Sequence, residues 1–161
     1  MVNADCQVQK NALGHQRIEG PWSRIQIDYI GPFPTTSRGN KYCLVIADPF
    51  SKWVEAIPTK TSTAWVTAKQ LFNIVFSSMG IPRVIDSDSG SHFVGDVMQE
   101  LCKALGIKQC FHIAGHPESS GQVERTNRTL KEALKKQVKS SGRDWDEKLP
   151  LILMSLRGSK A

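Results

Sequence analysis

IQIDYIGPFPTTSRGNKYCLVIA, residues 25–47, is the stretch that decides the fold. Apolar and polar side chains alternate at its start, which is typical of a β-strand with one buried face, so we predict a strand over Trp22–Ile30. Gly31–Pro34 end that strand, and a turn with Gly39-Asn40 at its tip follows. Tyr42–Ala47 is a continuous apolar run, which predicts a central strand buried on both faces.

A third short strand, Lys52–Ile57, stops at Pro58, so the three strands are predicted to form an antiparallel meander. Helices and strands alternate after it. Hydrophobic spacing and capping residues first predict a helix over Ala64–Phe76 that ends at Gly80, and then a strand over Arg83–Asp86. The next predicted elements are a helix buried through Phe93, Val97, Leu101 and Leu105, and a strand over Lys108–His112. The last two are a long helix capped by Ser119 and Gln122 and a helix over Asp144–Leu156. This order predicts an α/β fold, with a mixed five-stranded sheet flanked by helices.

The charge of the chain is unevenly distributed. The 161 residues carry a net charge of +6, and the segment from Glu124 to Arg143 has seven basic and two acidic residues. A basic segment of this kind suggests an anionic partner such as nucleic acid. No apolar run approaches the roughly 18 residues of a membrane span. Because the N-terminus is polar, no secretory signal is expected, and we predict one intracellular domain without membrane contact.

The four cysteines are Cys6, Cys43, Cys102 and Cys110. The last three have apolar neighbours and are expected to be reduced, buried thiols, so no disulfide framework is predicted. His112 and His116 lie near Cys110, but a zinc site there is disfavoured because no C-x-x-C pair accompanies them. Trp53, Trp65 and Trp145 are expected in the core rather than as base-stacking platforms.

Three carboxylates occupy positions that favour a functional site. Asp28 lies inside the first predicted strand, where an acid is costly unless it faces a functional edge or a metal. Asp88 follows the fourth strand, where ligand sites collect, and Glu124 lies in the first turn of the long helix, where the dipole favours its charge. Each also has a plain structural explanation, as a surface acid, a turn residue and a helix-start acid. Their combination, with 35 residues between Asp88 and Glu124, favours one shared site.

Five stretches stand in a fixed order along the chain: I-Q-I-D-Y-I-G-P-F, G-N-K-Y-C-L-V-I-A-D-P-F-S-K-W-V-E-A-I-P, G-I-P-R-V-I-D-S-D-S-G-S-H-F, H-P-E-S-S-G-Q-V-E-R-T-N-R-T-L-K and W-D-E-K-L-P-L-I-L-M-S-L-R. They resemble the retroviral integrases, of the gammaretroviral and related retrotransposon type. The resemblance covers about residues 20–158. Several long motifs in the right order are far more specific than a lone triad.

The resemblance implies a ribonuclease H-like fold and a catalytic triad of Asp28, Asp88 and Glu124, which would also be the metal ligands. It implies two Mg²⁺ or Mn²⁺ ions in the active state, with Asp28 on both ions and one further acid on each. The implied reactions are hydrolytic trimming of a DNA 3′ end and attack of that 3′ hydroxyl on a target strand. Retroelement ends, target DNA and a second copy of the chain are the implied partners, and the nucleus is the implied location.

The predicted long helix carries a basic face beside Glu124. Arg128, Lys131 and Lys135 follow Glu124 at i+4, i+7 and i+11, next to the apolar stripe. Such charges are commonly a solvated helix face, but their placement beside Glu124 favours phosphate contacts. The resemblance implies that Arg128 and Lys131 approach the processed DNA end. The full set of predicted DNA-contacting residues is Ser119, Ser120, Gln122, Arg128, Lys131 and Lys135.

The start of the chain departs from the pattern of the family. We expect residues 1–19 to be a leader, the degenerate tail of an N-terminal zinc domain, and residues 20–161 to be the catalytic core. Gln9 stands where the family commonly has a second cysteine after Cys6, so no zinc is predicted there. Ser89 stands where Asn is common after the second acid, which we expect to weaken activity without abolishing it.

An alternative function remains from the sequence. The chain would then be a catalytically silent or domesticated integrase-derived module that binds DNA or oligomerises. The intact triad favours the enzyme, whereas the expected absence of the flanking domains of a full integrase favours the module.

Overall fold

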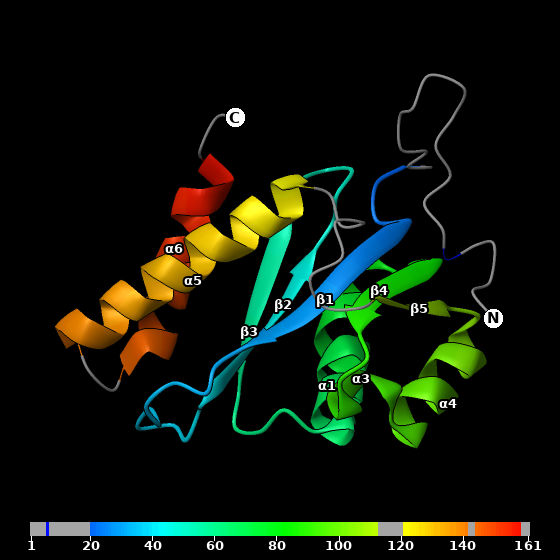
Figure 1. Cartoon of the computed structure of the whole chain (residues 1–161), viewed down its shortest axis with the longest axis horizontal. Helices are drawn as coiled ribbons and strands as arrows, with labels where there is room; N and C mark the ends of the chain where they lie inside the picture. Colours follow the sequence, from blue (N-terminus) through cyan, green and yellow to red (C-terminus); the bar gives the residue numbers. More distant parts are fainter. Residues whose placement is uncertain (1–5, 7–19, 113–120, 142–143, 159–161) are drawn as a thin grey trace.

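The computed structural model describes residue 6 and residues 20–112, 121–141 and 144–158. Five strands form one sheet in the order β3-β2-β1-β4-β5 (Figure 1). They are β1 (Arg24–Ile30), β2 (Tyr42–Ala47), β3 (Val54–Thr59), β4 (Val84–Asp88) and β5 (Lys108–His112). β1, β2 and β3 form an antiparallel meander, and β4 and β5 run parallel to β1. The predicted mixed five-stranded sheet is confirmed.

The edge strand β3 differs from its prediction. Pro58 does not stop it, because Pro58 pairs in register with Cys43 of β2 and Thr59 pairs with Tyr42. Proline has no N–H to donate to a neighbouring strand. An edge strand tolerates it, because the position without an N–H can face the side that has no neighbouring strand. The predicted end at Pro58 was therefore wrong, since the sequence does not state which strand lies at the edge.

A continuous helical stretch follows β3. It consists of α1 (Ala64–Gln70), the π-helical η2 (Leu71–Phe76) and α2 (Ser77–Met79). The Thr63 side chain caps its start by accepting from the Val66 N–H at 3.2 Å. Gly80 ends it with a φ of 92°, so the predicted stop is confirmed.

The second predicted helix is divided into α3 (Ser91–Val94) and α4 (Asp96–Leu105). Gly95 lies between them in an extended conformation. The helical spacing is interrupted there, so different positions of α4 face the core than an unbroken helix would place there. Met98 is consequently fully buried, whereas Val97, predicted in the buried stripe, is 37 % exposed. That part of the prediction was wrong.

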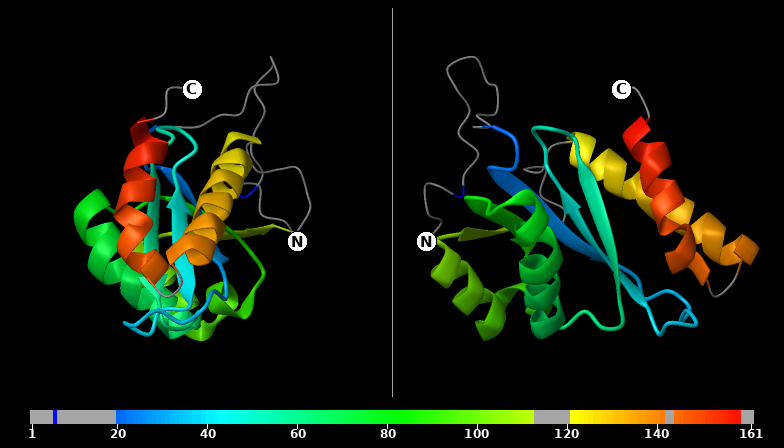
Figure 2. Two further views of the ribbon diagram at one scale, coloured as in Figure 1. Left: turned by 90° about the vertical axis from the view of Figure 1, so that its left-hand side faces the viewer. Right: turned by 180° about the vertical axis from the view of Figure 1, so that it is seen from behind.

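The two faces of the sheet carry separate cores. Side chains of β1, β2 and β4 pack with those of α1, η2, α3 and α4 on one face; they include Ile25, Ile27, Leu44, Ile46, Leu71, Ile85, Phe93 and Met98. On the other face lie α5 (Gly121–Ser141) and α6 (Trp145–Gly158), side by side in both views of Figure 2. Their core includes Ile30, Val45, Val54, Leu130, Leu134, Trp145 and Leu149. Among the described helices, none is long and apolar enough to cross a bilayer.

The cysteine prediction needs a correction. Cys110 is buried as expected, but it forms a disulfide with Cys6 instead of being reduced. The sequence could not show this pairing because 104 residues separate the two cysteines and only the fold brings them together. Cys43 and Cys102 are free and buried as predicted, and burial raises the pKa of Cys43 to about 12 and that of Cys102 to about 11.

Two of the three tryptophans expected in the core lie at the surface. Trp145 is fully buried, as predicted, but Trp65 is 65 % exposed and Trp53 is 37 % exposed. Trp65 projects from α1 away from its buried residues, Thr67 and Ala68. The Arg157 guanidinium lies 3.8 Å from the centre of the Trp53 ring, which gives this surface indole a cationic partner.

Candidate active site

Asp28 points to the face of the sheet that α5 covers. Residues of β1 alternate between the two faces, and Ile25 and Ile27 belong to the core beneath α1 and α4. Ile30 belongs to the core beneath α5 and α6, as does Val45, the register partner of Asp28. The side chain of Asp28 therefore shares the α5 face, next to an apolar core.

The parallel pairing of β1 with β4 brings Asp88 beside Asp28. Gln26 of β1 lies opposite Asp86 of β4, and two residues further along each strand come Asp28 and Asp88. A step of two residues keeps each side chain on the same face as Gln26 and Asp86. β4 extends two residues beyond its predicted end, so Asp88 is the last residue of the strand rather than a residue after it.

The pKa of the Asp28 carboxyl is raised above its ordinary value. The main cause is burial, which removes water from the charged form, and the negative charge of Asp88 adds to the rise. The Tyr29 N–H donates to Asp28 Oδ1 at 2.8 Å and acts in the opposite direction, as do the charges of Lys131 and His92. Two carboxylates in such proximity repel each other, and a bound divalent cation would relieve that repulsion.

A tight turn directly after β4 holds the side chain of Asp88. The Gly90 N–H donates to Asp88 Oδ1 at 2.7 Å, and His92 Nε2 lies 3.9 Å from the same oxygen. A Cβ at Gly90 would lie 2.7 Å from His92 Nε2 and 2.9 Å from Asp88 Oδ1, so only glycine fits without displacement. His92 in turn packs edge-on against Tyr29 and Phe93. The sequence reasoning missed His92, although its position four residues after Asp88 was a usable signal.

The donor chemistry fits a hard divalent cation. Among the residues that the structure describes, the second oxygen of Asp28 and of Asp88 accepts no hydrogen bond. Carboxylate oxygens are the ligands that Mg²⁺ and Mn²⁺ prefer. Among the described side chains, no group of three residues is placed to bind a metal. For the third acid, Glu124, the structure gives the position of the backbone, as the fourth residue of α5.

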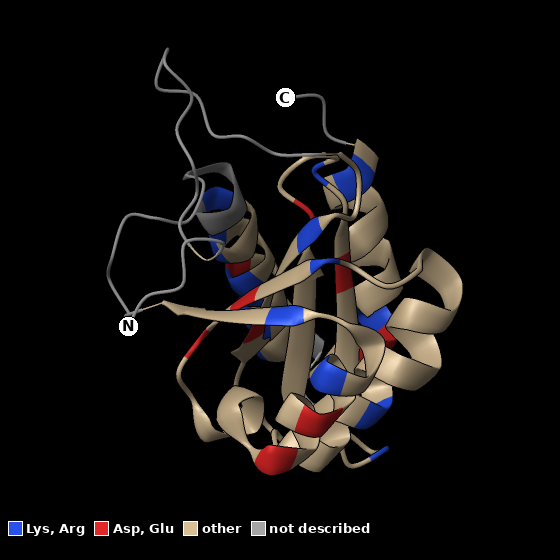
Figure 3. Cartoon of the chain, turned by 90° about the vertical axis from the view of Figure 1, so that its right-hand side faces the viewer, with Lys and Arg blue, Asp and Glu red and all other residues tan. Residues whose placement is uncertain are grey.

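The basic face of α5 has the arrangement that the helical spacing predicts. Leu130 and Leu134 are fully buried against the sheet, whereas Arg128, Lys131 and Lys135 are exposed. The charge of Lys131 acts on the Asp28 carboxyl, so this face lies close to the acids. Figure 3 shows Lys and Arg positions of α5 (blue) near acidic positions (red) of the neighbouring strands. Of the other predicted DNA contacts, Ser119 and Ser120 lie outside the described residues, and Gln122 is described by its place in α5.

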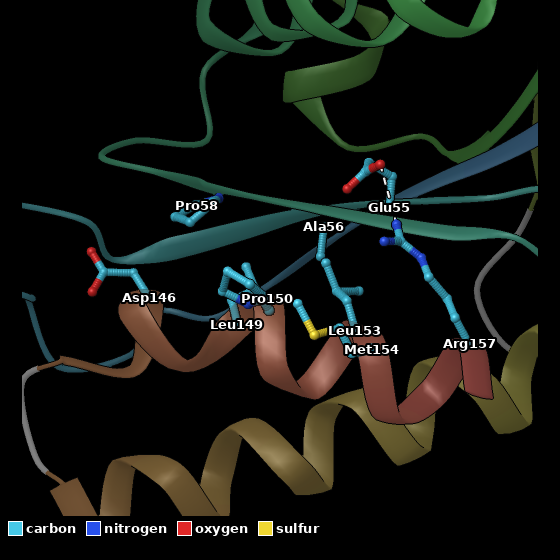
Figure 4. Close-up of a pocket in the computed structure, with 9 residues that line it drawn as sticks. All are labelled: Glu55, Ala56, Pro58, Asp146, Leu149, Pro150, Leu153, Met154 and Arg157. Atoms are coloured by element: carbon cyan, nitrogen blue, oxygen red, sulfur yellow. Dashed lines mark ion pairs between the residues drawn. The ribbon is translucent and has the colours of Figure 1, made fainter. Parts of the chain in front are cut away.

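A separate groove of about 410 Å³ lies between β3 and α6 (Figure 4). Its lining is mainly apolar and consists of Ala56, Pro58, Leu149, Pro150, Leu153 and Met154. At one end Arg157 forms an ion pair with Glu55 at 3.2 Å, and Asp146 lies at the other end. Of the predicted catalytic and DNA-contacting residues whose side chains the structure describes, none lines this groove.

Comparison with known protein families shows which family the chain belongs to. The sequence model of the family described as "Integrase core domain" matches residues 19–117. The chain belongs to the integrase core family. Retroviral integrases are enzymes of the DDE polynucleotidyl transferase superfamily, and the predicted resemblance is thus confirmed.

Similar sequences come from gammaretroviral polyproteins. The Gag-Pol polyprotein of Koala retrovirus is 48 % identical over 145 residues, which is 89 % of this chain and 8 % of the polyprotein. The Pol polyprotein of Radiation murine leukemia virus (strain Kaplan) is 44 % identical over 162 residues, 98 % of this chain and 28 % of the polyprotein. The chain therefore spans less than a third of either relative.

Similar solved structures confirm the ribonuclease H-like fold. The catalytic core domain of BIV integrase has a TM-score of 0.67 and 27 % identity, over 87 % of this chain and 86 % of the other. The HTLV-2 integrase catalytic core in complex with magnesium, in a dimeric form, has a TM-score of 0.68 and 26 % identity, over 89 % of this chain and 92 % of the other. A chain of the simian T-cell lymphotropic virus intasome, in complex with a PP2A regulatory subunit, has a TM-score of 0.71 and 27 % identity over 99 % of this chain and 59 % of the other.

Proposed function

We propose that this chain is the catalytic core of a metal-dependent DNA strand transferase. It would trim the 3′ end of a retroelement DNA and join that end to a target strand. The observation that carries the proposal is the pair of Asp28 and Asp88, which share one sheet face and interact electrostatically beside Lys131. Chromosomal DNA is the proposed target, so the nucleus is the proposed place of action.

Asp28, Asp88 and Glu124 would hold the metal, either Mg²⁺ or Mn²⁺, with two ions in the active state. When bound, such ions activate the attacking oxygen and stabilise the departing one in phosphoryl transfer. The turn at Gly90 holds one Asp88 oxygen, and the Tyr29 N–H holds one Asp28 oxygen, so both carboxylates are oriented before metal arrives. Orientation of this kind reduces the reorganisation needed during reaction.

The exposed side chains of Arg128, Lys131 and Lys135 would bind the DNA backbone along α5. Their helix continues from Glu124, so a phosphate bound at Lys131 would lie near the carboxylates. Ser119, Ser120 and Gln122 are the further contacts proposed at the start of that helix. Phosphate contacts position the DNA but carry no direct sequence information, which fits an enzyme that acts on many target sites.

The discriminating experiment uses a branched DNA that mimics the joined product, with Mn²⁺ or Mg²⁺. Wild type is compared with Asp28→Asn, Asp88→Asn and Glu124→Gln. Each substitution keeps the shape of the side chain and removes a charge that would hold metal, so we expect product to fall by about 10³-fold or more. Glu132→Gln is the matched control, because Glu132 is an exposed acid on the same helix and should retain activity.

Equal product from wild type and the three triad variants would rule out the assigned site. A wild type that binds DNA but yields no product with either metal would contradict the enzyme and favour the binding module instead.

We further propose that two copies of the chain associate through the side of the molecule that carries β3. Large apolar side chains are exposed on α6, which packs on β3, and on α1 and η2: Leu151, Met154, Trp65 and Phe72. Met154 also lines the apolar groove between β3 and α6. Exposed apolar area of this kind commonly marks an interface, and the similar HTLV-2 core occurs in a dimeric form.

A further inference from the structure

A buried ionic cluster crosses the three strands that lead to the proposed catalytic acids. Arg24 of β1 donates to Asp86 of β4 twice, from Nε to Oδ2 at 2.5 Å and from Nη2 to Oδ1 at 2.7 Å. His112 of β5 completes it, with Nε2 2.6 Å from Asp86 Oδ1. Because an ionised carboxylate only accepts hydrogen bonds, His112 Nε2 is the donor. These residues are called the Arg24–Asp86–His112 cluster below.

Burial makes the cluster a strong geometric constraint. Asp86 is only 3 % exposed, and the side chains of Arg24 and His112 are 17 % and 23 % exposed. Loss of one partner from such a pair leaves a buried charge without compensation, which is strongly unfavourable. The two-point contact with a planar guanidinium also fixes orientation as well as distance. β1, β4 and β5 are therefore held in one relative position at this point.

Each member of the cluster lies close in the chain to one part of the carboxylate site. Arg24 and Asp28 share a face of β1, and Asp86 and Asp88 share the same face of β4. His112 is the register partner of Asp88 and the last residue of β5, the strand from which the chain proceeds to α5 and Glu124. The cluster thus joins the two strands that carry Asp28 and Asp88 to β5, the strand that precedes α5 in the chain.

We propose that the Arg24–Asp86–His112 cluster positions the carboxylate site. It sets the relative placement of β1, β4 and the end of β5, so that Asp28 and Asp88 meet at the distance a divalent cation needs. Its members act through the carboxylates and touch neither metal nor DNA. The inference rests on the proposed function, because it assigns these residues a role in that same site. Small displacements of a catalytic group lower rates steeply, so this positioning is measurable.

Three variants test the cluster. Asp86→Asn leaves one acceptor oxygen and turns an N–H₂ toward the donors of its partners. His112→Leu removes the donor, whereas His112→Gln keeps an N–H₂ near the position of Nε2. For Asp86→Asn and His112→Leu we expect kcat on branched DNA to fall about ten-fold or more, with the KM for DNA changed less than about two-fold. Mn²⁺ affinity, measured by calorimetry without DNA, should fall several-fold in the same variants, and His112→Gln should restore most of both.

Asp48→Asn is the matched control. Asp48 lies in the turn after β2 and is 2 % exposed. It accepts hydrogen bonds from the backbone N–H groups of Trp22 and Phe50. Its loss should lower the melting temperature while leaving kcat and Mn²⁺ affinity unchanged. A merely structural cluster would give the same pattern in Asp86→Asn and His112→Leu, and that result would overturn the proposal.

The two proposals fail in different ways. An inactive wild type contradicts the strand-transfer function. The Mn²⁺ affinities of the variants then still test whether the cluster positions the carboxylates. If Asp86→Asn does not fold, the comparison of His112→Leu with His112→Gln decides. Equal kcat and equal Mn²⁺ affinity in those two variants would overturn the positioning role.

Discussion

Asp28 illustrates at the scale of one residue how the proposed metal site conflicts with folding. Its pKa is raised chiefly by burial and further by Asp88. An acid whose pKa is higher in the folded chain destabilises the fold at every pH above that pKa, where it is charged in both states. The destabilisation is relieved as the pH falls through the raised pKa and the carboxyl becomes protonated.

Asp28→Asn should therefore stabilise the metal-free chain at neutral pH, because the amide keeps the acceptor for the Tyr29 N–H and removes the charge. We expect the melting temperature to rise by a few degrees. The gain should disappear on acidification through the pKa of Asp28, where the wild-type carboxyl is also neutral. Thermal melts across pH measure this, with the exposed Asp96→Asn as control. An Asp28→Asn chain less stable than wild type at neutral pH would contradict the account.

Gly90→Ala should damage the site without unfolding the chain. The new Cβ would force His92 and Asp88 apart, since it would lie within 3 Å of both. We expect DNA-joining activity to fall about ten-fold or more, with a change in stability of about 1 kcal/mol or less. Gly158→Ala is the control, because a Cβ there meets nothing within 4 Å. Full activity in Gly90→Ala would mean that the Asp88 turn is not needed.

At the scale of the elements, α5 joins the core to the DNA that it is proposed to bind. Leu130 and Leu134 fix one side of the helix in the core beneath the sheet. Lys131 flanks this apolar side of the helix, and its charge acts on the Asp28 carboxyl. The orientation of the basic face thus follows from the burial of the apolar stripe.

Lys131→Glu should weaken DNA binding and reduce the slope of log Kd against log salt by about one or more, because a phosphate contact and its released counterion are lost. Titrations at several salt concentrations measure the slope. Lys136→Glu makes the same charge change on the same helix away from the proposed face and should alter the slope less. Identical slopes for Lys131→Glu and wild type would exclude the contact.

Local patterns predicted most of the elements, because strand alternation, helical spacing and capping residues act over a few positions. The features that failed depend on distant parts of the chain. Pro58 is tolerated because β3 is an edge strand, Cys110 meets Cys6 across the fold, and Trp65 faces away from the core. The acids could be named from their motifs, but the proximity of Asp28 to Asp88 required the parallel register. The Arg24–Asp86–His112 cluster was invisible for the same reason.

At the scale of the whole molecule, the Cys6–Cys110 disulfide links the start of the chain to β5. A crosslink over 104 residues restricts the unfolded chain and should contribute roughly 2–4 kcal/mol. Reductant should therefore lower the melting temperature of wild type by several degrees. Cys6→Ser should melt at the temperature of reduced wild type and respond no further to reductant. A wild-type melting temperature that is insensitive to reductant would contradict this contribution.

The exposed apolar side of the molecule should support a dimer. Met154 is 66 % exposed beside the groove, so Met154→Asp would place a charge in the proposed interface. Sedimentation velocity should show a dimer for wild type and a monomer for Met154→Asp. Val97→Asp, at an exposed apolar position of α4, should remain dimeric. A wild type that stays monomeric at all working concentrations would contradict the interface.

The central claim is that Asp28, Asp88 and Glu124 hold divalent metal. The most direct measurement is a crystal structure with Mn²⁺, in which anomalous scattering locates the ions. The account predicts Mn²⁺ peaks in contact with carboxylate oxygens of Asp28 and Asp88, with Glu124 of α5 turned toward the same ions, and loss of the peaks in Asp88→Asn. Saturating Mn²⁺ with no anomalous peak at these carboxylates would contradict it.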